Sequence, residues 1–111
     1  MIARNGLLEK LPGPVDEALK VLASNLRTAR LRRNLSVQDV ADRIGVSRRL
    51  VTDAERGKPS TGVAVYVAML WTLGMVEGLA AVADPRNDKV GMAASLGRER
   101  KRAGRSGRDD F

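Results

Sequence analysis

The sequence predicts an all-α protein, a compact bundle of five helices followed by a flexible basic tail. Hydrophobic residues make up 43% of the 111-residue chain, whereas aromatic residues make up only 3%. A core of small and aliphatic side chains suits packed helices better than sheets, which favour aromatic and β-branched residues. Apolar residues also recur every three or four positions between residues 14 and 83, the spacing of a buried helix face. These two observations predict the helical fold.

Changes in composition divide the chain into four predicted segments. Residues 1–13 form a loose arm that ends in the breaker Pro-Gly-Pro, and residues 14–84 form the helical domain. Residues 85–97 are predicted to be a short apolar segment that contacts a second copy or a partner, in which residues 90–96 form either a strand that pairs across a dimer axis or a helix remnant folded on the core. Residues 98–111 are rich in Gly and Arg and bury too little apolar surface to become ordered, so we expect disorder when they are free.

The first helix is predicted from Pro14 to Arg33, and Asn34 can end it. Proline suits a first helical turn because its φ is already helical, and the acidic residues that follow favour a helix N-terminus. The stripe that faces the core is predicted to be Leu19, Leu22, Leu26 and Ala29.

Two short helices joined by a tight turn are predicted next. Ser36 is a good N-cap with Asp39 three residues further on, and Gly45 can take the left-handed conformation that stops the helix. Ser47 then caps a helix that runs to Gly57. The buried residues of this pair are predicted to be Val40, Ala41, Ile44, Leu50, Val51 and Ala54.

Two further helices complete the predicted bundle. The fourth ends at Gly74, and a short fifth helix covers residues 75–83. Trp71 is predicted to lie in the core, because it stands at helical spacing in an apolar segment, and the alternative is that it anchors a protein interface. The core side of the fourth helix is predicted to be Val63, Val67, Leu70 and Leu73.

Positive charge is concentrated in the two-helix region and in the tail. The formal net charge is +7; residues 26–58 hold nine basic and four acidic residues, and residues 98–111 hold six basic and three acidic ones. This distribution favours a polyanionic partner, and a helix pair with two arginines at the start of its second member suits the major groove of DNA. The tail could be a second DNA contact, an arm that binds a protein partner, or only an aid to solubility.

The residue types that are missing exclude several kinds of site. The chain has no cysteine and no histidine, which removes disulfides, thiol catalysis and the thiolate and imidazole ligands of metals. No carboxylate pair stands in an evident cleft, so we expect no enzyme, no metal and no cofactor. The N-terminus is too polar for a signal peptide, and the apolar stretch 62–75 is too short to span a bilayer. We therefore expect a soluble cytoplasmic protein.

Two phrases in the two-helix region carry a family resemblance. They are DVADRIGVS at residues 39–47 and, in register, VTDAERGK at residues 51–58. Through them the chain resembles the phage-repressor-like helix-turn-helix proteins called the Xre family, over about residues 22–83. The resemblance implies a five-helix bundle like that of lambda repressor, whose third helix lies in the major groove while the second crosses the backbone.

The resemblance also assigns roles to residues. Arg30 and Glu55 match positions that form a structural ion pair between the first and third helices. The predicted base contacts, at the start and along the exposed side of the third helix, are Ser47, Arg48, Arg49, Thr52 and Asp53. The resemblance places Lys58 and Ser60 in a loop that usually touches phosphate, and the predicted phosphate contacts also include Gln38 of the second helix and the basic Arg33 near the end of the first.

Several of these side chains have a second interpretation. Arg48 and Arg49 can each bond a guanine edge bidentately, but they could also be phosphate contacts or solvated surface charge. Asp53 could accept a hydrogen bond from a cytosine amino group or pair with Arg49, four residues before it. Arg33 could instead complement the dipole at the end of the first helix.

One position departs from the family pattern. The family commonly places glutamine at the first position of the second helix, where it contacts phosphate, but this chain has Val37 there. Gln38 comes next and could replace that contact only with a rotated side chain.

A narrower resemblance concerns three blocks around the paired helices. The blocks PVDEALKVLASNLRTARLRR, VAMLWTLGMVEGLAAVADP and DKVGMAASL look like those of antitoxins paired with HipA-type kinase toxins. This resemblance implies a homodimer that represses its own operon and binds a HipA-like kinase toxin. The alternatives are a stand-alone Xre-type regulator, or a protein-interaction module that does not bind DNA specifically.

Overall fold

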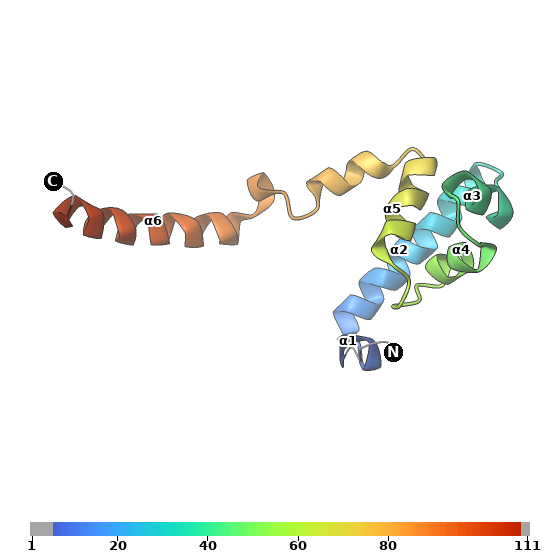
Figure 1. Cartoon of the computed structure of the whole chain (residues 1–111), viewed down its shortest axis with the longest axis horizontal. Helices are drawn as coiled ribbons and strands as arrows, with labels where there is room; N and C mark the ends of the chain where they lie inside the picture. The colour runs from blue at the N-terminus through green and yellow to red at the C-terminus, as the bar shows by residue number, and fades with distance from the viewer. Residues whose placement is uncertain (1–5, 110–111) are drawn as a thin grey trace. The chain divides into compact units, whose positions relative to one another are not determined.

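The computed structural model describes the backbone of residues 6–109 and the side chains of residues 6–104. Within this part of the chain every regular element is helical, which confirms the all-α prediction (Figure 1). The chain divides into two compact units, residues 1–76 and residues 77–111. The predicted domain boundary at residue 84 therefore differs from the division seen in the structure.

The first unit is the helical bundle. Its elements are α1 (Gly6–Glu9), α2 (Gly13–Arg32), α3 (Val37–Ile44), α4 (Arg48–Glu55) and α5 (Val63–Thr72). Helices α2 to α5 occupy the places of the first four predicted helices. The predicted fifth helix is present as a 3-10 helix, η1 (Val76–Ala81). Helix α1 is a single turn inside the segment predicted to be a loose arm, and residues 1–5 of that arm lie outside the described residues.

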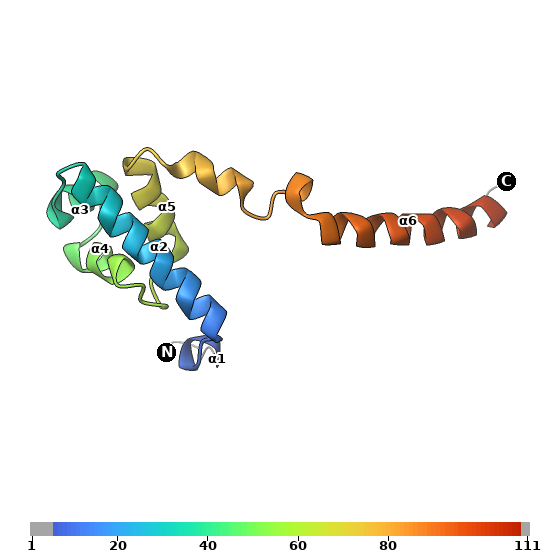
Figure 2. The ribbon, with the colours of Figure 1, turned by 180° about the vertical axis from the view of Figure 1, so that it is seen from behind.

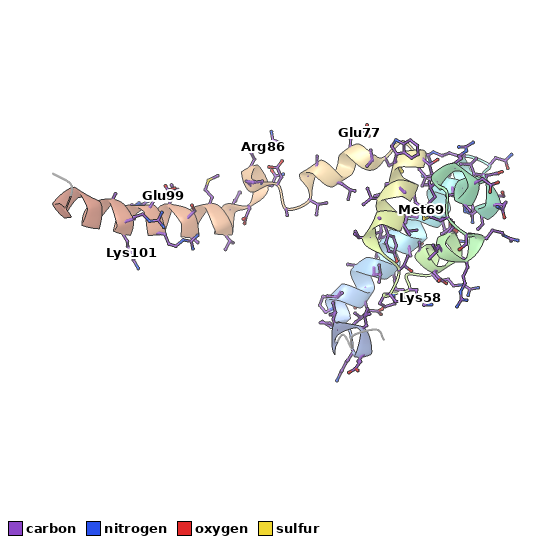
Figure 3. All side chains as sticks on the ribbon, viewed as in Figure 1. Lys58, Met69, Glu77, Arg86, Glu99 and Lys101 are labelled. Atoms are coloured by element: carbon purple, nitrogen blue, oxygen red, sulfur yellow. The ribbon has the colours of Figure 1, made fainter. Side chains whose placement is uncertain are left out.

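Helices α3 and α4 pack against each other and against α5, and α2 packs on α4, as Figures 1 and 2 show from opposite sides. Small residues on three helices let the backbones come close: Ala29 of α2, Ala41 of α3 and Ala54 of α4 are all buried. The larger members of this core are Leu26, Val40, Val51, Tyr66, Met69 and Leu73. Figure 3 shows Met69 on the helix that closes this core.

The prediction for the core side of α5 is confirmed for Leu73, which is buried, and for Leu70, which packs against the core, but it is wrong for Val63 and Trp71. Val63, predicted to be buried, is 75% exposed, and Trp71, predicted for the core, is 62% exposed. The buried residues of α5 are Tyr66 and Met69. The sequence VAVYVAMLWT is apolar all round, so its periodicity does not select one face, and packing against α3 and α4 decides which side is buried.

The predicted end of α2 is confirmed, and one predicted core residue of α4 is wrong. Asn34 ends α2 as predicted, with a left-handed φ of 55°. Leu50 was predicted to face inward but is 37% exposed, because Val51 and Ala54 occupy the inner face of α4.

The second unit contains the rest of η1, the 3-10 helix η2 (Pro85–Asn87) and the long helix α6 (Lys89–Asp109). Of the two alternatives for the apolar segment 85–97, the strand is not present, since this segment belongs to η2 and α6. Residues 98–109, expected to be disordered when free, are helical in the structure, and residues 110–111 lie outside the described residues. Composition alone suggested disorder, but Asp88 caps the helix by accepting a hydrogen bond from the Gly91 N–H at 2.9 Å. The helix that starts there continues through the basic segment.

None of the helices within residues 6–109 combines the length and apolar character that crossing a membrane would require.

Candidate nucleic-acid interface

Helix α3 begins at a capping box that the sequence predicted. The Ser36 hydroxyl accepts a hydrogen bond from the Asp39 backbone N–H at 2.9 Å, and the Asp39 carboxylate accepts one from the Ser36 N–H at 2.8 Å. These backbone and hydroxyl hydrogen bonds hold the pKa of Asp39 below its ordinary value. The box fixes the direction in which α3 leaves the loop.

The turn between α3 and α4 depends on Gly45 and Ser47. Gly45 has a φ of 76°, a left-handed conformation in which a residue without a Cβ meets no steric penalty. Its N–H, like that of Val46, donates to the Ala41 carbonyl, which closes the end of α3. The Ser47 hydroxyl then accepts a hydrogen bond from the Leu50 N–H at 3.3 Å and starts α4. Ser47 is therefore the N-cap of the second helix.

A buried ion pair holds the far end of α4. The Arg30 guanidinium donates two hydrogen bonds to the Glu55 carboxylate, at 2.7 and 2.8 Å, and a third to the Leu35 carbonyl at 2.8 Å. Only 8% of the Arg30 side chain and 6% of the Glu55 side chain are exposed. The bonds to Glu55 raise the pKa of Arg30. The predicted structural pair is confirmed, and it ties α2 to α4 and to the loop that precedes α3.

A second anchor lies just after α4. The Lys20 ammonium donates to the carbonyls of Arg56 and Gly57, at 3.2 and 3.3 Å. Gly57 has a φ of 69°, and a Cβ there would approach Lys20 Cδ to 3.0 Å and Ala23 Cβ to 3.4 Å. Glycine at this position lets the end of α4 lie against α2.

These elements form an open concavity of about 750 Å³ on the outer side of α4. Arg48 and Arg49 are exposed, and within the described residues neither guanidinium has a hydrogen bond or ion pair. The full lining is Lys20, Arg48, Arg49, Thr52, Asp53, Arg56, Lys58 and Pro59, five cations to one carboxylate. Such a surface attracts a polyanion and leaves two forked donors free to bind it.

The carboxylate in this concavity is partly neutralised by a neighbour. Asp53 lies 3.7 Å from the Lys58 ammonium, and 18% of its side chain is exposed. Its predicted alternative partner was Arg49. The ion pair present in the described residues is with Lys58 instead, because the loop after α4 folds back and the Lys58 N–H donates to the Asp53 carbonyl at 3.0 Å. Figure 3 labels Lys58 in this loop.

A family model described as helix-turn-helix domain matches residues 21–82, more than half of the chain. The chain belongs to the helix-turn-helix domain family. No curated protein and no solved structure matches the chain. Membership of this family makes the protein a DNA-binding regulator, with α3 and α4 as the two helices of the motif.

The helix-turn-helix domain gathers only part of the predicted site. Arg48, Arg49, Thr52, Asp53 and Lys58 line one concavity. Four other predicted contacts do not line this concavity: Ser47, Gln38, Arg33 and Ser60. Ser47 instead caps α4.

Two of those outlying side chains are bonded elsewhere. The Gln38 amide donates to the Asp42 carboxylate at 2.7 Å, one turn along α3. The Arg33 guanidinium donates to the Ala29 carbonyl at 2.8 Å, which is the alternative role at the end of α2. Val37, at the position where the family has glutamine, is half-buried and packs against the core. Phosphate contacts by Gln38, Arg33 and Ser60 stay predictions.

Sequence reasoning missed Lys20 and Arg56, which line the concavity. Arg56 stands seven residues after Arg49, two helical turns further on, so helical periodicity could have placed it on the same side. Lys20 had no such signal, because it reaches the concavity only through the packing of α2 on α4.

Proposed function

We propose that this chain is a sequence-specific transcriptional repressor that binds double-stranded operator DNA as a homodimer and is not an enzyme. The observation that carries the proposal is the pair of exposed guanidinium groups, Arg48 and Arg49, at the start of α4 in a positive concavity. A helix N-terminus that presents forked donors suits the edges of bases in the major groove. Such a role places the protein in the cytoplasm, with its operator.

In the proposed mechanism, different residues bind the phosphate backbone and recognise the bases. Lys58 and Arg56 supply positive charge beside α4 and would hold the phosphate backbone, which fixes the register of the helix on the duplex. Arg48 or Arg49 would then bond a guanine edge bidentately, and Thr52 would contact a neighbouring base. The Arg30–Glu55 pair holds α4 in place before DNA arrives, so little order has to be gained on binding.

The proposed dimer rests on an exposed apolar face of α5. Helix α5 contains no charged residue, yet one of its sides faces outward. On that side Val63, Ala64 and Trp71 are exposed and Val67 is half-buried. An apolar face of this kind favours burial against a partner, and tryptophan is a frequent energetic centre of interfaces. A second copy of the chain offers the same face, as a two-fold dimer requires.

Selection from a pool of randomised duplexes tests this function. The expected enriched sequence has two inverted half-sites whose centres lie about 10–10.5 base pairs apart, because a two-fold dimer presents its recognition helices roughly one DNA turn apart. Binding to that sequence should exceed binding to random duplex by at least about 10³-fold. A pool that gains no sequence preference would contradict the proposal.

A Trp71→Glu variant serves as the control for the dimer. The side chain is exposed, so the charge should leave the fold intact and remove the dimer, measured by light scattering after gel filtration. Trp71→Phe keeps an apolar ring and should remain dimeric. A Trp71→Glu protein that is still a dimer and still selects paired half-sites would exclude α5 as the interface.

The antitoxin role is a narrower proposal, supported by the resemblance of three sequence blocks to partners of HipA-type kinases. It predicts that a HipA-like kinase is encoded beside this gene and forms a stable complex with the chain, detected by co-purification of the two proteins. An operon without such a kinase would leave a stand-alone Xre-type regulator. A chain that binds the kinase but no specific duplex would be a protein-interaction module instead.

A further inference from the structure

Helix α6 carries a basic face that the helix-turn-helix motif does not use. Arg98, Lys101 and Arg102 are three and four residues apart, so they lie on one side of the helix. All three are exposed, and no hydrogen bond or ion pair involves them among the described residues. Glu99 and Lys101 project on opposite sides of α6 in Figure 3, so the acidic residue borders this face beside Arg102 and does not divide it.

Few interactions within the described part of the chain stabilise α6 as a helix. None of the side chains of residues 89–104 is buried, and glycines stand at positions 91, 97, 104 and 107. Glycine disfavours a helix, and like charges three or four residues apart repel each other. A polyanion that neutralises the cations would therefore favour the helical form. The sequence adds two more arginines in the last two turns, Arg105 and Arg108.

We propose that the basic face of α6, made by Arg98, Lys101 and Arg102, is a second DNA contact that binds the phosphate backbone without reading sequence. The inference rests on the proposed function. Residues 98–102 of a helix span about 6 Å, and duplex DNA carries one phosphate charge per about 1.7 Å of its axis. The face can therefore meet several phosphates at once, and its charge is complementary to theirs.

The chain limits where this contact falls. Val76 and Lys89 are separated by thirteen residues, which span at most about 45 Å when fully extended. Arg98 and Arg102 lie a further ~14 and ~20 Å along α6, so the second contact must fall within roughly twenty base pairs of the end of the first unit. Because both contacts belong to one chain, binding by α4 raises the local concentration of α6 at the flanking DNA.

The test compares salt dependence between the full-length chain and a variant with Arg98→Ala, Lys101→Ala and Arg102→Ala. The logarithm of the binding constant falls with the logarithm of salt concentration by about 0.9 per phosphate neutralised. The triple variant should therefore show a slope smaller by about 2 to 3, equally on the selected duplex and on random duplex. A duplex trimmed of its flanks should erase the difference between variant and parent.

A matched pair of single variants checks that the contact uses one helix face. Arg98→Ala should lower the slope by about 1, whereas Arg100→Ala, with the same charge loss on another side of α6, should leave it almost unchanged. An unchanged slope in the triple variant would overturn the proposal. Equal decreases of the slope in Arg98→Ala and Arg100→Ala would also overturn it, because an unstructured cationic segment would bind DNA through all of its charges alike.

Vesicles with anionic headgroups separate DNA from a membrane surface. If the triple variant loses binding to phosphatidylserine vesicles while its DNA slope is unchanged, the face belongs to a lipid surface and the proposal fails. Failure of the proposed function is recognised separately. In that case the parent chain would not distinguish the selected duplex from random duplex, yet the slope on random duplex would still report on α6.

Discussion

Replacing Glu55 by alanine is expected to lower the free energy of unfolding by about 3–5 kcal/mol, the cost of leaving a buried charge without its partner. Arg30 would keep its bond to the Leu35 carbonyl but lose both bonds to the carboxylate. The side chains are almost completely buried, so solvent screening does little to reduce the penalty. Urea denaturation followed by circular dichroism measures the change.

The control for this prediction removes both charges together. An Arg30→Met, Glu55→Leu double variant replaces the pair with apolar side chains of similar length, and its stability should lie close to that of the parent chain. The difference between single and double variants isolates the unpaired charge from the loss of packing. If the free energy of unfolding of Glu55→Ala lies less than about 1 kcal/mol below that of the parent chain, the pair does not anchor α4.

Replacing Arg49 by alanine is expected to weaken the discrimination between the selected duplex and random duplex. A bidentate contact between arginine and guanine contributes about 1–3 kcal/mol of discrimination, so specific affinity should fall by roughly 5- to 150-fold. Binding to random duplex should weaken only slightly, because one phosphate contact at most is lost. Fluorescence anisotropy with both duplexes at the same salt concentration measures the two affinities.

Arg27→Ala is the matched control for Arg49→Ala. Arg27 is an exposed arginine of α2 that does not line the concavity, so its loss removes the same charge from another place. Discrimination should be unaltered in this variant. If Arg49→Ala also leaves discrimination intact, Arg49 is not the residue that reads the base.

The two-helix motif could be predicted closely because its signals are local. Ser36 and Ser47 bond to backbone groups three residues away, and Gly45 takes the conformation for which it is suited. The Arg30–Glu55 pair joins distant residues, and it was predicted only through the family resemblance. The capping and turn residues therefore predicted where the motif lies, and the family resemblance predicted the ion pair that anchors it.

What could not be predicted depends on packing. The exposed side of α5, with Trp71, is decided by which part of a uniformly apolar helix meets the core. Lys20 reaches the concavity only because α2 crosses the end of α4. Composition also misjudged residues 98–109, where a capped helix that begins at Lys89 continues through a segment poor in apolar residues.

The two anchors of α4 lie at one end of the helix, and the exposed arginines lie at the other. Glu55 and Gly57 are fixed by α2, whereas Arg48 and Arg49 are exposed. Substitutions at positions 48 and 49 can therefore accumulate without threatening the fold. This separation makes the scaffold evolvable: descendants of the gene can acquire new operators by changing two codons while the supporting residues stay the same.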